Sequence, residues 1–183
     1  MLRRGDILVV ETGTGMLHTN PMRLPDGVEN ETQTLWGSIG WATPALMGIC
    51  LAEPDRRVVV VTGDGAHGMT LNEIPVMGRY SIKPIIFVLK NDIHGVEDVV
   101  GDPGHEFNVL PIIEYNELPK SMGCQNWFTT KVSTVAELED AIRRIETHDG
   151  AAYVSVMIPK EESQPLPDWR KDHAYKVYTP EAL

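Results

Sequence analysis

Four runs of apolar, mostly β-branched residues limit what this chain can fold into: ILVVE (7–11), VVVVT (58–62), IIFVL (85–89) and AYVSVMI (152–158). None of these runs alternates polar with apolar residues, so each is expected to be a strand that is covered on both faces. Helical patterns lie between them, at 38–52, 71–81 and 134–147. This alternation predicts a doubly wound α/β fold, with a mostly parallel sheet, helices on both faces and ligands at the carboxyl ends of the strands.

The length of 183 residues is enough for one domain with a sizeable core. We expect that domain to span 1–160. The tail, 161–183, is charged and rich in proline, and is expected to be an extended arm. The segment 98–116 shows no clear periodicity and is expected to be a long loop at the active site or at an interface.

Charge and hydropathy exclude several classes of partner. The formal net charge of −10 argues against nucleic acid, which is bound by basic patches. No apolar run is long enough to span a bilayer, and the run after Asp6 is too short for a signal peptide. Cys50 and Cys124 lack metal-ligand spacing and are typical of buried thiols in a reducing compartment. A cytoplasmic protein is therefore expected.

Two of the predicted strands are followed by polar residues that suit a metal. Asp64 lies between Gly63 and Gly65 after the second run, and Asn91 follows the third run, 27 residues further on. In adjacent parallel strands these side chains would meet at one edge of the sheet, where a carboxylate and an amide oxygen suit Mg²⁺ or Ca²⁺. The glycines would let backbone N–H groups approach a diphosphate. GDG alone is also a common turn after a strand; the pair favours the metal site.

Several motifs in the same order resemble those of one enzyme family. The segment GDGAHGMTLNEIPVMGRYSIKPIIFVLKNDIHGVE (63–97) resembles the thiamin diphosphate motif of pyruvate decarboxylase and its relatives. ETGTG (11–15) is similar to the family's ETGTS, and LWGSIGWATPALMG (35–48) is similar to its YWGSIG segment. The resemblance covers residues 2 to 160. It implies the C-terminal, diphosphate-binding domain of a thiamin diphosphate-dependent 2-keto-acid decarboxylase of the pyruvate or indolepyruvate type.

The resemblance implies a set of metal ligands. Asp64 and Asn91 would bind Mg²⁺ through their side chains, and Ile93 would bind it through its main-chain carbonyl. Ile93 stands where the family has glycine, which a main-chain ligand tolerates. Lys90 stands where the family has the first asparagine of its pair, whereas the ligand is the second.

The resemblance also implies contacts with the cofactor, at Thr12, Thr14, Gly37, Ile39, Gly63, Asp64, Gly65, Ala66, Asn91 and Ile93. The backbone at Gly37 and Ile39 would hold the aminopyrimidine, and the Ile39 side chain would keep the cofactor bent. Ala66 stands where the family has serine, so one hydroxyl contact to the diphosphate would be missing.

Glu97 is the candidate catalytic residue. It lies six residues beyond Asn91, where pyruvate and indolepyruvate decarboxylases resemble each other in carrying a glutamate near the reactive carbon. The implied role is proton delivery after CO₂ leaves, which yields an aldehyde. Related carboligases, similar to acetolactate synthase, do not generally place an acid there. A solvated acid at a helix start, stabilised by the helix dipole, is the alternative for this residue.

Other functions and partners stay open at this level. A carboligase, or a non-catalytic module for cofactor binding or assembly, is the alternative to a decarboxylase. Family members have three domains, and this chain resembles only the last. The resemblance therefore implies a pyrimidine-binding domain or partner chain that supplies the activating glutamate, and an oligomer. The chain would be either a fragment or a separate subunit. His67 and His94 flank the site and are expected to support it or to lie at the surface.

Overall fold

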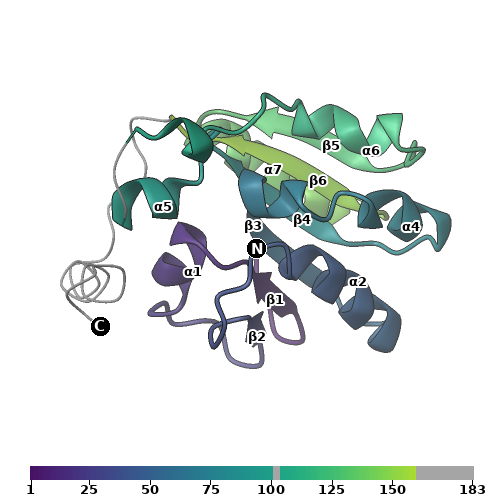
Figure 1. The fold of residues 1–183 in the computed structure, drawn as a ribbon. Coiled ribbons are helices and arrows are strands. Elements are labelled where there is room, and N and C mark those ends of the chain that lie inside the picture. The colour runs from purple at the N-terminus through teal and green to yellow at the C-terminus, as the bar shows by residue number, and fades with distance from the viewer. Residues whose placement is uncertain (101–103, 160–183) are drawn as a thin grey trace.

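The computed structural model describes residues 1–100 and 104–159 (Figure 1). The predicted arm at 161–183 lies outside the described residues. No helix within the described ranges is long and apolar enough to cross a membrane. Cys50 and Cys124 are both free, Cys50 half-buried and Cys124 buried.

The described residues form one six-stranded sheet in which every strand pair is parallel, in the order β2-β1-β3-β4-β6-β5. The strands are β1 (Ile7–Val10), β2 (Glu29–Thr32), β3 (Val58–Gly63), β4 (Ile85–Lys90), β5 (Phe128–Val132) and β6 (Ala152–Met157). The four apolar runs of the sequence are therefore the four inner strands. The edge strands β2 and β5 were not predicted, because ENET and FTTKV are polar segments of which little is buried.

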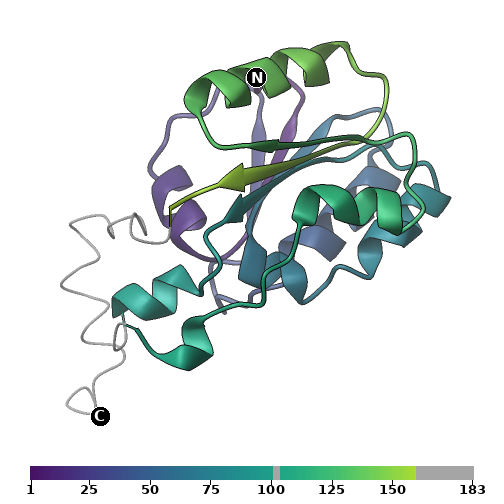
Figure 2. The same ribbon diagram turned by 90° about the horizontal axis from the view of Figure 1, so that it is seen from above.

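Helices cover both faces of this sheet. They are α1 (Thr14–Thr19), α2 (Ala42–Ala52), α3 (Asp64–Gly68), α4 (Glu73–Arg79), α5 (Gly95–Val100), α6 (Leu118–Ser121) and α7 (Val135–Thr147). Leu46 of α2 and Met77 of α4 belong to one apolar core, and Leu17 of α1 and Ile145 of α7 belong to another. Figure 2 shows α7 on the opposite side of the sheet from α4 and α6. The predicted doubly wound α/β fold is confirmed.

Three helices were predicted from the sequence, and the structure agrees with their predicted bounds to different degrees. The pattern at 134–147 is α7, which Thr134 and Glu137 begin with a reciprocal capping box. The pattern at 38–52 is helical only from Ala42, because positive φ angles at Gly37 and Gly40 turn the chain before it. The pattern at 71–81 is reduced to 73–79 in α4.

The described parts of the segment 98–116, residues 98–100 and 104–116, are more ordered than the expected long loop. The end of α5 and two 3-10 helices, Glu106–Asn108 and Tyr115–Glu117, occupy part of this segment. The backbone N–H of His94 donates to the carbonyl of Asn108 at 2.8 Å. The N–H of Leu110 donates to the carbonyl of Asp92 at 2.9 Å. These bonds, which sequence periodicity does not reveal, fold the segment back against the end of β4.

Candidate functional site

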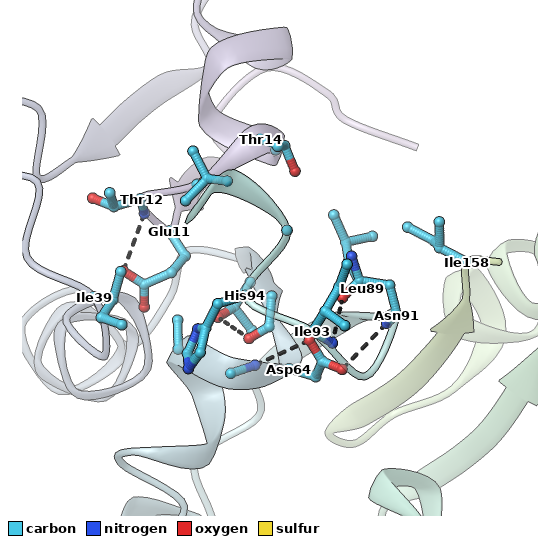
Figure 3. Close-up of a pocket in the computed structure, with 18 of the residues that line it drawn as sticks. Glu11, Thr12, Thr14, Ile39, Asp64, Leu89, Asn91, Ile93, His94 and Ile158 are labelled. Atoms are coloured by element: carbon cyan, nitrogen blue, oxygen red, sulfur yellow. Dashed lines mark hydrogen bonds between the residues drawn. The ribbon is translucent and has the colours of Figure 1, made fainter. Parts of the chain in front are cut away.

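A pocket lies at the carboxyl ends of β1, β3 and β4 (Figure 3), where ligands bind in open α/β sheets. Its walls come from the β1–α1 turn, the loop before α2, the β3–α3 turn and the segment from the end of β4 into α5, together with Ile158. The sequence-predicted site residues that line it are Thr12, Thr14, Ile39, Gly63, Asp64, Gly65, Ala66, Asn91, Ile93 and Glu97.

Asp64 is a buried carboxylate of this pocket, only 2% exposed. Its Oδ1 accepts a hydrogen bond from the N–H of Gly65 at 3.0 Å. Its Oδ2 accepts from the N–H groups of Asn91 and Asp92, at 3.2 and 2.8 Å. The ends of β3 and β4 therefore meet as the sequence predicted. Burial raises the pKa of Asp64, although the N–H groups of Asp92 and Gly65 oppose this shift. A bound cation would favour the charged form.

The oxygen donors near Asp64 fit a hard divalent cation. Asn91 and Ile93 line the pocket beside Asp64, and the Asn91 Oδ1 accepts from the N–H of Ile93 at 3.3 Å. A carboxylate, an amide oxygen and a main-chain carbonyl are the ligand types that Mg²⁺ and Ca²⁺ prefer. Within residues 1–100 and 104–159, no three His, Cys, Asp or Glu side chains cluster as metal ligands. The donor set therefore resembles an oxygen site for Mg²⁺ rather than a zinc site.

Lys90, directly before Asn91, is a buried cation. Its side chain is 4% exposed, and its Nζ lies 2.5 Å from the Asp92 Oδ1. Because the Asp92 charge raises the pKa of Asp64, pairing Asp92 with a cation limits the repulsion between the two carboxylates.

The two glycines beside Asp64 face different surroundings. A Cβ at Gly63 would have no atom within 4 Å. A Cβ at Gly65 would lie 2.6 Å from the Cε1 and 2.7 Å from the Nδ1 of His94, so the imidazole occupies the space that a side chain would need. His94, which was expected to flank the site, therefore forms part of the pocket wall.

Ile39, expected at the aminopyrimidine end, lies on the other side of the pocket from Asp64, together with Thr12 and Thr14, which were expected to contact the cofactor (Figure 3). Thr12, Thr14 and Ile39 line this wall. Gly37 does not line it: with a φ of 60° it forms the turn before Ile39, and a Cβ there would lie 3.8 Å from the Thr12 Cγ2. The predicted backbone contact of Gly37 with the cofactor stays a prediction.

Glu97 lies in the first turn of α5, is exposed and lines the pocket. This position agrees with a proton donor that faces the pocket, and equally with a solvated acid at a helix start. Its catalytic role stays a prediction.

Two residues at or behind the pocket, Glu11 and Tyr115, were not singled out from the sequence. Glu11 is 2% exposed and lines the pocket. The Tyr115 hydroxyl donates to the main-chain carbonyl of Asp64 at 2.8 Å. Glu11 carried the same signal as Asp64, an acid directly after a buried run, whereas Tyr115 lies in a segment without any pattern.

His67, which the sequence placed beside the site, is fully buried behind the pocket. Its Nδ1 lies 2.7 Å from the Thr43 Oγ1 and its Nε2 lies 2.8 Å from the Tyr153 hydroxyl. These bonds join α3 to α2 and β6. His67 is therefore a supporting residue, not a surface one.

The fold and the pocket together define an α/β domain of the phosphate- and cation-binding class. Glycine turns, a buried aspartate and an amide side chain converge at the carboxyl ends of adjacent parallel strands.

Residues 13–156 match the family described as "Thiamine pyrophosphate enzyme, C-terminal TPP binding domain", and the chain belongs to that family. Thiamin diphosphate is the cofactor that this family binds.

Similar proteins include keto-acid decarboxylases from bacteria and yeast. The chain is 35% identical over 162 residues to the alpha-keto-acid decarboxylase of Mycobacterium avium (strain 104). The matched region covers 88% of this chain and 29% of that protein. The chain is also 35% identical over 164 residues to pyruvate decarboxylase isozyme 2 of Saccharomyces cerevisiae. This matched region covers 86% of this chain and 29% of the yeast protein. The chain thus spans less than a third of the length of these relatives.

Proposed function

We propose that this chain is the diphosphate- and Mg²⁺-binding part of a thiamin diphosphate-dependent enzyme that converts a 2-keto acid into an aldehyde and CO₂. The observation that carries the proposal is the meeting of Asp64 and Asn91 in one pocket, at the ends of two adjacent strands, in a chain of this family. The names of the relatives, alpha-keto-acid decarboxylase and pyruvate decarboxylase, support the reaction.

In this proposal the two sides of the pocket hold opposite ends of the cofactor. Asp64, Asn91 and the Ile93 carbonyl hold Mg²⁺, and the backbone from Gly63 to Ala66 receives the diphosphate. Ile39 packs against the other end, with Thr12 and Thr14 beside it. When bound, thiamin diphosphate supplies an electron sink for the carbon that loses CO₂.

Glu97 is the residue that we assign to proton transfer. Its place in the pocket wall, past the metal-binding residues, supports a role in protonating the product carbon. The same position supports decarboxylation over carboligation, because delivery of a proton ends the reaction at the aldehyde.

We also propose that a pyrimidine-binding domain or partner chain covers this pocket, supplies the activating glutamate and makes the working enzyme a cytoplasmic oligomer. Leu35 and Trp36 support a covering partner: they are 84% and 79% exposed and lie in the loop that leads to Ile39. Large apolar side chains exposed together beside a pocket are typical of surfaces that another protein segment buries.

Calorimetry with thiamin diphosphate tests the binding proposal. The full chain is expected to bind it in Mg²⁺, and either EDTA or Asp64→Asn should weaken binding at least about tenfold, because each removes a charged contact. Asp55→Asn, at an exposed aspartate that does not line the pocket, is the matched control and should bind as wild type. Binding that is unaffected by the chelator would refute the metal site.

A further inference from the structure

Glu11 joins the end of β1 to the start of α2. Its Oε1 accepts from the N–H of Thr12 at 3.1 Å, and its Oε2 accepts from the N–H of Ala42 at 3.0 Å, across 31 residues of sequence. Ala42 begins α2, and Trp41, the N-cap residue, makes no side-chain cap bond. The first N–H groups of a helix have no partner within the helix. The Glu11 carboxylate therefore caps α2 from a different element, and its charge suits the helix dipole.

The loop that Glu11 holds carries Ile39 into the pocket. Gly37 and Gly40 have φ angles of 60° and 79°, so the chain turns tightly on both sides of Ile39. Gly40 also packs on the other side of the site: a Cβ there would lie 3.1 Å from the Met69 Cβ and 3.4 Å from the Ala66 carbonyl oxygen. The loop is thus fixed at two points, by the Glu11 carboxylate and by contact with α3.

The acceptor chemistry at this position requires a carboxylate. Both Glu11 oxygens receive backbone N–H groups in a place that is 2% exposed. Burial raises the pKa of Glu11, and the N–H groups of Ala42 and Thr12 oppose that shift. A glutamine of the same shape would offer one acceptor and one donor, so one N–H would face an N–H₂ group. A buried donor left without an acceptor is costly.

We propose that Glu11 is a positioning residue for the cofactor pocket: by holding the loop 37–41, it fixes Ile39 at the aminopyrimidine end of the bound cofactor. This role rests on the proposed function, because it assigns the two ends of the pocket to the two ends of thiamin diphosphate. It predicts that loss of the Glu11 carboxylate weakens binding of the aminopyrimidine end of thiamin diphosphate and leaves binding of the diphosphate end unchanged.

Ligand binding by Glu11→Gln tests this division. In Mg²⁺, the full-length variant should bind thiamin diphosphate about tenfold more weakly than wild type, the cost of one unsatisfied buried donor. Its affinity for inorganic pyrophosphate should stay unchanged, because that probe contacts only the Asp64 end. Glu31→Gln, at an exposed glutamate of β2, is the matched control. Equal weakening of both ligands would indicate a merely structural role and overturn the proposal, as would no weakening of either.

Amide exchange in the ligand-free chain separates this proposal from the proposed function. Glu11→Gln should speed exchange at Trp41 and Ala42 about tenfold, while amides of β3 keep their wild-type rates. If wild type binds neither ligand, the proposed function fails, but faster exchange still supports the Glu11 contact with the loop. Unchanged exchange at Ala42 would overturn the positioning role whatever the ligand data show.

Discussion

His67 and Asp64 are three residues apart in the chain, and burial shifts their protonation in opposite directions. Burial disfavours the charged form of each group, so it lowers the pKa of His67 to about 3 and raises the pKa of Asp64. The neighbours fit this difference. His67 contacts the neutral hydroxyls of Thr43 and Tyr153, whereas Asp64 accepts backbone N–H groups and faces the proposed cation. His67 therefore supports the site as a neutral group, whereas Asp64 is the proposed ligand of a cation.

The His67 shift predicts how stability depends on pH. The unfolded histidine has a pKa of about 6.5, so below that pH the unfolded chain binds a proton that the folded chain does not. The folded pKa is about 3. This contribution is therefore complete above pH 6.5 and is lost as the pH falls towards 3, at about 1.4 kcal/mol per pH unit.

Urea unfolding of wild type and His67→Gln at pH 7, 6 and 5 measures this contribution. The difference between their free energies of unfolding should shrink over this range, because glutamine does not titrate. His148→Gln, at an exposed histidine, is the matched control. Parallel pH profiles for wild type and His67→Gln would show that His67 is not held neutral.

At the scale of the elements, α3 and the segment after β4 meet through Gly65 and His94. An alanine in place of a helical glycine ordinarily stabilises a helix by up to about 1 kcal/mol. At Gly65 the new Cβ would fall 2.6 Å from the His94 ring, so the imidazole must leave its place in the pocket wall. We expect Gly65→Ala to lower the free energy of unfolding by about 1 kcal/mol or more, as overpacking does.

Two further variants isolate that contact. Gly48→Ala, in α2, places its Cβ where no atom lies within 4 Å and should be neutral or stabilising. Adding His94→Ala to Gly65→Ala should remove most of the cost, because it removes the ring. A Gly65→Ala penalty that persists in the double variant would contradict the contact as its cause.

How far the sequence predicted these elements depends on where their stabilising contacts lie. The inner strands and α7 carry their signal locally, as continuous apolar runs and as the Thr134 capping box. Asp64 and Asn91 could be paired because parallel strands end at one edge of the sheet. The Glu11 bond to Ala42 and the Tyr115 bond to Asp64 join residues 31 and 51 positions apart. No local pattern encodes such bonds: the position of Glu11 after a buried run was visible in the sequence, but its partner Ala42 was not, and Tyr115 had no local signal at all.

At the scale of the whole molecule, the proposed function makes this pocket one wall of a larger site. The proposed metal and diphosphate positions lie on this chain, whereas the activating glutamate is proposed to come from elsewhere. The chain matches 29% of the Mycobacterium avium relative, which leaves room in that protein for further domains. Binding and turnover should therefore separate: the chain can hold cofactor with its own residues, but fast chemistry requires the covering partner.

A chimera tests that separation. With thiamin diphosphate, Mg²⁺ and pyruvate, the isolated chain should release no CO₂ above the protein-free rate. A chimera in which these residues replace the matching segment of the Saccharomyces cerevisiae relative should release CO₂. The remaining parts of that protein would supply the missing wall of the site. Asp64→Asn within the chimera should abolish release, and Asp55→Asn should not.

Enzymic turnover by the isolated chain would show that no partner is needed. A chimera that binds thiamin diphosphate as tightly as the yeast protein, but releases no CO₂ from pyruvate or from bulkier 2-keto acids, would contradict the decarboxylase assignment itself.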